Sequence, residues 1–68
     1  MTPAELKAAR RELGLNKVEM AQTLKTKYRT YVPWDRGTTP IPGAVEVAVG
    51  LLLEKDRRFM QSLLVETR

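Results

Sequence analysis

Apolar residues recur every three or four positions along most of the chain, which is the period of a helix that packs on one side. A first helix is predicted over residues 3–13, because Thr2 and Glu5 have the spacing of a capping box and Gly14 supplies a stop. A second, shorter helix is predicted over residues 17–24, with Asn16 as its cap and Glu19 three residues after the cap. No stretch shows the alternation typical of a strand, so the pattern predicts an all-α fold.

A third helix is predicted over residues 28–36, with Gly37 as its stop. Tyr31 and Trp34 are three positions apart and share one of its faces, which we expect to be buried. Pro33 conflicts with this helix, because it lacks a backbone N–H and crowds the carbonyl of Arg29, at a cost of about 3 kcal/mol. The helix is therefore expected either to bend at Pro33 or to break and restart there.

The most apolar part of the chain follows a proline-containing loop. Eight of the ten residues 44–53 are hydrophobic, and the pattern over 43–66 fits either one helix or two, the second being capped by Asp56. A helix that is apolar nearly all round needs cover on more than one side, and a second copy of the same region can provide it. The residues predicted at this dimer interface are Val45, Val49, Leu52, Phe59 and Leu63. A monomer whose last helix folds back over the core is the alternative.

Length and charge narrow the possible functions. A chain of 68 residues forms one domain at most, and its core is marginal. Lys and Arg number 12 against 8 Asp and Glu, and the whole excess lies in residues 1–37, which hold eight basic and four acidic side chains. This asymmetry favours an anionic partner, with nucleic acid ahead of a membrane surface.

The chain contains neither cysteine nor histidine. Their absence excludes a disulfide framework, thiolate zinc sites and cysteine nucleophiles, and it removes the commonest general base. We therefore expect no enzyme, no cofactor and no metal site. The charged N-terminus does not resemble a secretory signal, and residues 44–53 are about half as long as a bilayer span. The sequence thus predicts a cytoplasmic protein without a membrane partner.

Two short helices joined by a tight connection are typical of a helix-turn-helix when basic and aromatic residues mark the second helix, which enters the major groove of DNA. The residues that match the sequence pattern of a known helix-turn-helix family are Leu13-Gly14-Leu15, Glu19-Met20-Ala21, Leu24, Arg29-Thr30, Trp34-Asp35-Arg36-Gly37 and Pro40-Ile41-Pro42. With this order and spacing, residues 3–42 resemble the Cro/repressor-type helix-turn-helix family of bacteria and their phages, also called XRE-like. The resemblance covers about forty of the 68 residues.

The resemblance implies a lambda-repressor-like domain of four to five short helices, with a DNA-binding region at 1–42 and a helical dimerisation region at 43–68. By the same resemblance, the positions that read bases are Lys27, Tyr28, Arg29 and Pro33. The positions that contact phosphates are Lys17, Lys25, Thr30 and Arg36. The chain departs from the family at the turn, where Lys25 replaces a glycine and Lys27 replaces the usual serine cap, so that Thr26 becomes the expected cap.

The sequence therefore predicts a sequence-specific DNA-binding transcriptional regulator of phage or mobile-element type. It is expected to be a homodimeric repressor that acts on an inverted repeat, with recognition helices about 34–36 Å apart. The resemblance also implies that it represses its own operon. One alternative is the antitoxin of a toxin–antitoxin pair, with the toxin as partner. A variant of the main interpretation is the small repressor encoded beside anti-CRISPR genes. A protein-interaction module that has lost DNA binding is the third possibility.

Overall fold

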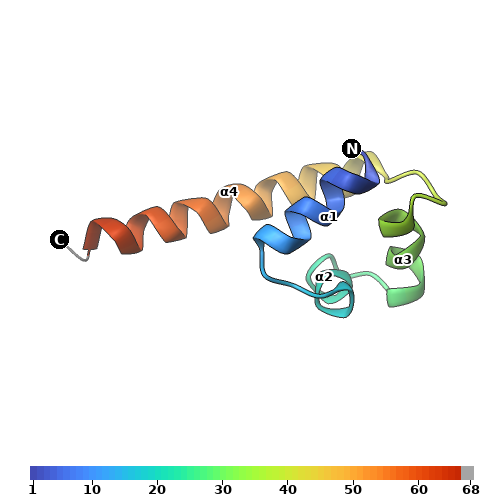
Figure 1. Ribbon diagram of the computed structural model, residues 1–68, viewed down its shortest axis with the longest axis horizontal. Helices are drawn as coiled ribbons and strands as arrows, with labels where there is room; N and C mark the ends of the chain where they lie inside the picture. Colours follow the sequence, from blue (N-terminus) through green and yellow to red (C-terminus); the bar gives the residue numbers. More distant parts are fainter. Residues whose placement is uncertain (67–68) are drawn as a thin grey trace.

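The protein is described by a computed structural model that covers residues 1–66. Its four helices are α1 (Pro3–Glu12), α2 (Lys17–Thr23), α3 (Tyr28–Arg36) and α4 (Gly43–Glu66), and residues 1–66 contain no strand. Helices α1 to α3 and the start of α4 form a small body, from which the rest of α4 projects (Figure 1). The predicted all-α fold is confirmed, while the last two residues of the predicted dimerisation region lie outside the described part.

The first two helices begin with reciprocal capping boxes, as their sequences predict. The Thr2 hydroxyl accepts the N–H of Glu5 at 3.1 Å, and the Glu5 carboxylate accepts the N–H of Thr2 at 2.8 Å. Asn16 and Glu19 form the same pair of bonds at 2.8 and 2.9 Å. Each box satisfies backbone donors that the first turn of a helix leaves free.

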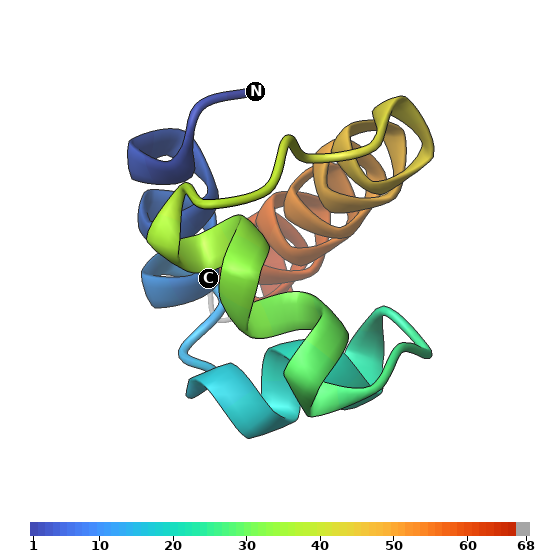
Figure 2. The ribbon, with the colours of Figure 1, turned by 90° about the vertical axis from the view of Figure 1, so that its right-hand side faces the viewer.

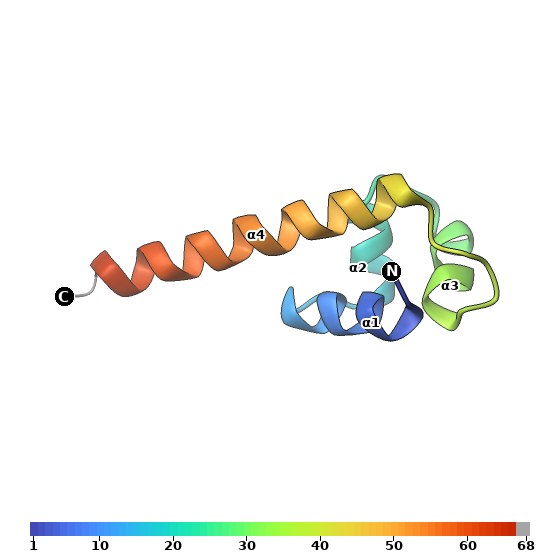
Figure 3. The same ribbon diagram turned by 90° about the horizontal axis from the view of Figure 1, so that it is seen from above.

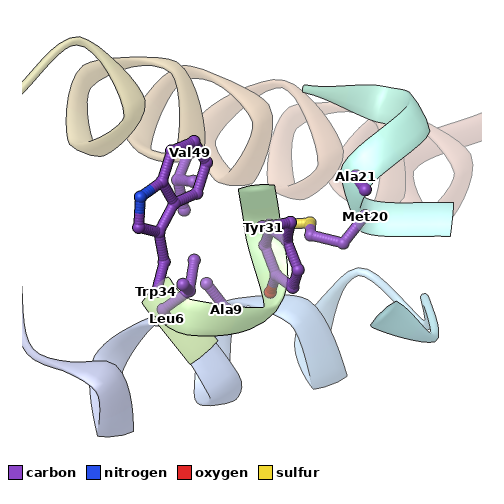
Figure 4. Close-up of a cluster of buried hydrophobic side chains, with 7 residues drawn as sticks. All are labelled: Leu6, Ala9, Met20, Ala21, Tyr31, Trp34 and Val49. Atoms are coloured by element: carbon purple, nitrogen blue, oxygen red, sulfur yellow. The ribbon is translucent and has the colours of Figure 1, made fainter. Parts of the chain in front are cut away.

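All four helices contribute to one core. Its members are Leu6 and Ala9 from α1, Met20 and Ala21 from α2, Tyr31 and Trp34 from α3, and Val49 from α4 (Figure 4). The rings of Tyr31 and Trp34 meet edge to face, with centroids 6.1 Å apart, which confirms that these aromatics are buried. Since α2 and α3 are too short to be stable alone, this shared core holds them in place.

The C-terminal region is one continuous helix, so Asp56 lies inside α4 and does not cap a separate helix. Residues 51–66 contain no glycine or proline, and their leucine, glutamate, lysine and arginine residues favour a helix throughout. The helix therefore runs past the body and makes the molecule 46 Å long but only 19 Å across (Figure 3). No helix in the described part of the chain combines the length and the apolar character that crossing a bilayer requires.

The start of α4 completes the core of its own chain, which corrects part of the predicted dimer interface. Val49 is fully buried against α1 to α3, so it is not available to a second subunit. Val45 also packs on this core, although it stays partly exposed. Leu52 is half-buried, whereas Phe59 and Leu63 are 61% and 42% exposed. The prediction failed at Val49 because the helical period is the same whether a face packs inside its chain or on another one.

Candidate nucleic-acid interface

Helix α3 lies at the end of the molecule opposite the free end of α4, and α2 packs beside it within the body (Figures 1 and 2). The two helices are joined by residues 24–27, and the N–H of Thr26 donates to the carbonyl of Ala21 at 3.0 Å, which tightens the turn. Helix α3 packs against both α1 and α2. The predicted arrangement of two short helices and a tight connection is therefore present, with α3 as the outermost element of this end.

Helix α3 has one buried face and one open face. Its buried side chains are Tyr31, Trp34 and Asp35. Helical spacing places Arg29, Pro33 and Arg36 on the opposite side. Arg29 and Arg36 are exposed there, and Pro33 between them is half-buried. Two of the predicted DNA-contacting side chains thus lie on the outward face of α3, with a proline between them.

The other predicted positions surround this face. The exposed ones are Lys25, Lys27, Tyr28 and Thr30, of which Tyr28 has 49% of its surface open. Lys17 is the first residue of α2 and is half-buried. Five of the eight predicted positions carry a positive charge, and the one acidic residue of α3, Asp35, is turned inward. The open face of α3 and its turn is therefore basic.

Pro33 does not break α3, which runs unbroken from Tyr28 to Arg36. Proline cannot donate to the carbonyl of Arg29, but both residues lie on the open side, where water can take the place of the missing donor. The carbonyl of Pro33 itself accepts the N–H groups of Gly37 and Thr38 at 3.0 Å each. These bonds close the helix, and Gly37 adopts the left-handed conformation of a C-cap.

The turn before α3 contains the two positions, Lys25 and Lys27, at which the sequence departs from the family pattern. Lys25 adopts a left-handed backbone with φ 58°, the conformation for which glycine is suited. The expected cap at Thr26 is wrong: Lys27 occupies the N-cap position, and its side chain makes no capping hydrogen bond. The start of α3 therefore relies on packing and on the turn, with no side-chain cap.

Replacing Lys25 with glycine is expected to stabilise the fold by about 1 kcal/mol, because the left-handed conformation costs a residue with a β-carbon about 1–2 kcal/mol. Lys25→Ala is the matched control, since it removes the same charge but keeps the β-carbon. Urea unfolding of both variants separates strain from charge. Equal stability of the two variants would contradict the assignment of strain to this position.

A buried polar network ties α3 to α1, and sequence reasoning did not find it. Asp35 is fully buried, and its Oδ2 accepts the Tyr31 hydroxyl at 2.8 Å and the Arg10 Nε–H at 3.2 Å. Arg10 also donates to the carbonyl of Leu15 at 3.3 Å. The side chain of Arg10 is only 14% exposed. The signal in the sequence was the i, i+4 spacing of Tyr31 and Asp35.

The buried network keeps the hydroxyl of Tyr31 protonated. Burial, with the adjacent carboxylate adding to it, raises the pKa of Tyr31 far above its usual value. The hydroxyl therefore stays protonated and remains a donor to Asp35. Because Arg10 belongs to α1 and the other two residues to α3, the network fixes how α3 sits on the body and hence where its open face points.

No protein-family model, no curated protein and no solved structure matches this chain. The likeness to the Cro/repressor-type family accordingly stands on the residues quoted above, and the function that it implies is a proposal.

Proposed function

We propose that this protein is a DNA-binding transcriptional regulator of the Cro/repressor type, with α3 as the helix that enters the major groove. One observation carries the proposal: α3 is held by its inner face while its outer face and flanks present Arg29, Arg36 and Lys27 to solvent. A rigid helix with cationic side chains on its open face suits the width and the charge of that groove.

Two kinds of contact follow from this placement. Arginine pairs with guanine through two hydrogen bonds, so Arg29 is the residue that we expect to read a base. Lys17, Lys25 and Arg36 flank it and are suited to phosphate contacts, which set the position of the protein without reading sequence. Lys27, Tyr28, Thr30 and Pro33 complete the surface that faces the duplex in this proposal.

The regulator is proposed to act as a homodimeric repressor in the cytoplasm, of the kind that phages and mobile elements encode. Binding to an inverted repeat at a promoter would exclude polymerase from it. A second candidate is an antitoxin, which the exposed apolar residues Phe59, Met60 and Leu63 of α4 favour because a toxin could cover them.

Arg29→Ala is expected to weaken binding to the specific site by about 1–3 kcal/mol per half-site and to relax base choice at one position. The matched control is Arg11→Ala, which removes the same charge from an exposed side chain that the proposal does not place on DNA. Selection of bound sites from random DNA, followed by titration, measures both affinity and preference. An unchanged site preference in Arg29→Ala would remove this residue from the proposed surface.

A further inference from the structure

The part of α4 that projects beyond the body is apolar on one side. This overhang comprises residues 54–66, and its exposed apolar side chains include Phe59, Met60 and Leu63. Two of its three basic side chains form ion pairs within the chain: Arg57 forms a two-point ion pair with Glu12, and Arg58 pairs with Glu54. The pair with Glu12 also ties the root of the overhang to α1. The overhang is therefore a supported rod with an apolar side.

The body carries an apolar hollow beside the same helix. One part, beside the end of α2, is lined by Leu24, Ala48 and Leu51. The other part, beside the end of α1, is lined by Leu13 and Phe59. Both parts share Leu52 and Lys55. We call this double hollow the crease. It extends along α4 from Ala48 to Phe59.

We propose that the overhang of each chain lies in the crease of a second copy, so that two α4 helices pair antiparallel around a two-fold axis near residues 55–58. Each chain has one apolar rod and one apolar hollow along the same helix, and only a reciprocal arrangement fills both in a closed dimer. In this arrangement Leu63 of one chain lies against Ala48 and Leu52 of its partner.

Buried area separates this orientation from a parallel one. The overhang is about 20 Å long and about 10 Å wide, so laying it in a crease removes on the order of 300 Å² from it. In the antiparallel pair each chain contributes a rod and a crease, which share Lys55 and Phe59. The dimer therefore buries on the order of 1,000 Å² in total, about the area that a stable interface needs. Parallel overhangs would cover only each other, over fewer than two heptads, and would bury an area typical of crystal contacts.

The arrangement also places α3 at the two outer ends of the dimer, since α3 lies at the far end of the body from the overhang (Figure 1). The role that we assign to the dimer rests on the proposed function, but the experiment that tests the dimer uses no DNA.

Engineered cysteines test the orientation directly, because the natural chain contains none. Leu63→Cys and Leu52→Cys are prepared separately, each with circular dichroism as the check on folding, and then oxidised alone and as a mixture. A disulfide requires Cα atoms within about 7 Å. We expect a cross-link between the two different variants in the mixture and none in Leu63→Cys alone. Ala48→Cys replaces Leu52→Cys as a second partner, so that a shift of one turn in the axis is also detected.

Two results would overturn the inference. The first is a self-cross-link of Leu63→Cys, which only parallel overhangs allow. The second is a wild-type protein whose mass in solution at micromolar concentration is that of one chain. A wild-type protein that forms a complex only with a different protein would also overturn the inference. Phe59→Lys is expected to lower the dimer mass to that of a folded monomer, because the overhang contributes nothing to the core. DNA titration of that monomer then tests the function of α3 separately.

Discussion

Raising the salt concentration from about 50 mM to about 200 mM is expected to weaken DNA binding about a thousand-fold. In the proposed complex, Lys17, Lys25 and Arg36 would contact three phosphates per subunit and six per dimer. Each neutralised phosphate releases counterions, so the logarithm of the affinity should fall with the logarithm of salt with a slope of about −5. Titration of a labelled duplex at several salt concentrations measures this slope.

Single variants separate phosphate contacts from base contacts in the same experiment. Lys17→Ala should weaken all sequences alike and reduce the slope by about one unit per subunit. Arg11→Ala is again the control, because the proposal does not place Arg11 on DNA, and its slope should match that of the wild type. An affinity for DNA that is independent of salt, or no binding at low salt, would refute the proposed function.

Arg10→Ala is expected to destabilise the fold by about 3–5 kcal/mol, because it leaves the fully buried carboxylate of Asp35 without its counter-ion. A domain of this size has only about 3–10 kcal/mol of stability, so the variant should be largely unfolded near body temperature. Thermal and urea unfolding followed by circular dichroism measure the loss. The neighbouring exposed Arg11 provides the control, and Arg11→Ala should change stability by less than about 0.5 kcal/mol.

A second substitution tests the cause of that loss. Adding Asp35→Asn to Arg10→Ala removes the unpaired charge while it keeps an acceptor for the Tyr31 hydroxyl. Part of the stability should therefore return, and the double-mutant cycle should show coupling between the two positions. Losses that simply add, or an Arg10→Ala variant as stable as Arg11→Ala, would show that the ion pair does not hold α3 to α1.

Local features of the fold could be predicted where the signal lies within a few residues. The capping boxes at Thr2 and Asn16 and the stops at Gly14 and Gly37 depend on spacings of three or four residues, and they place the first three helices to within one residue. The burial of Tyr31 and Trp34 followed from their shared face. The continuity of α3 through Pro33 did not follow, because the cost of a proline depends on whether water reaches the carbonyl that it leaves unpaired.

The amino-acid sequence by itself determined the all-helical fold, the basic character of the N-terminal half and the set of side chains on the open face of α3, since helical period and composition suffice for these. Only the tertiary structure decided that Val49 belongs to the core of its own chain and that Arg10 meets Asp35 across 25 positions. It also decided that α4 runs on past the body. Periodicity shows that a helical face is apolar or that a residue is charged, but the partner of each is chosen by contacts between segments far apart in the chain.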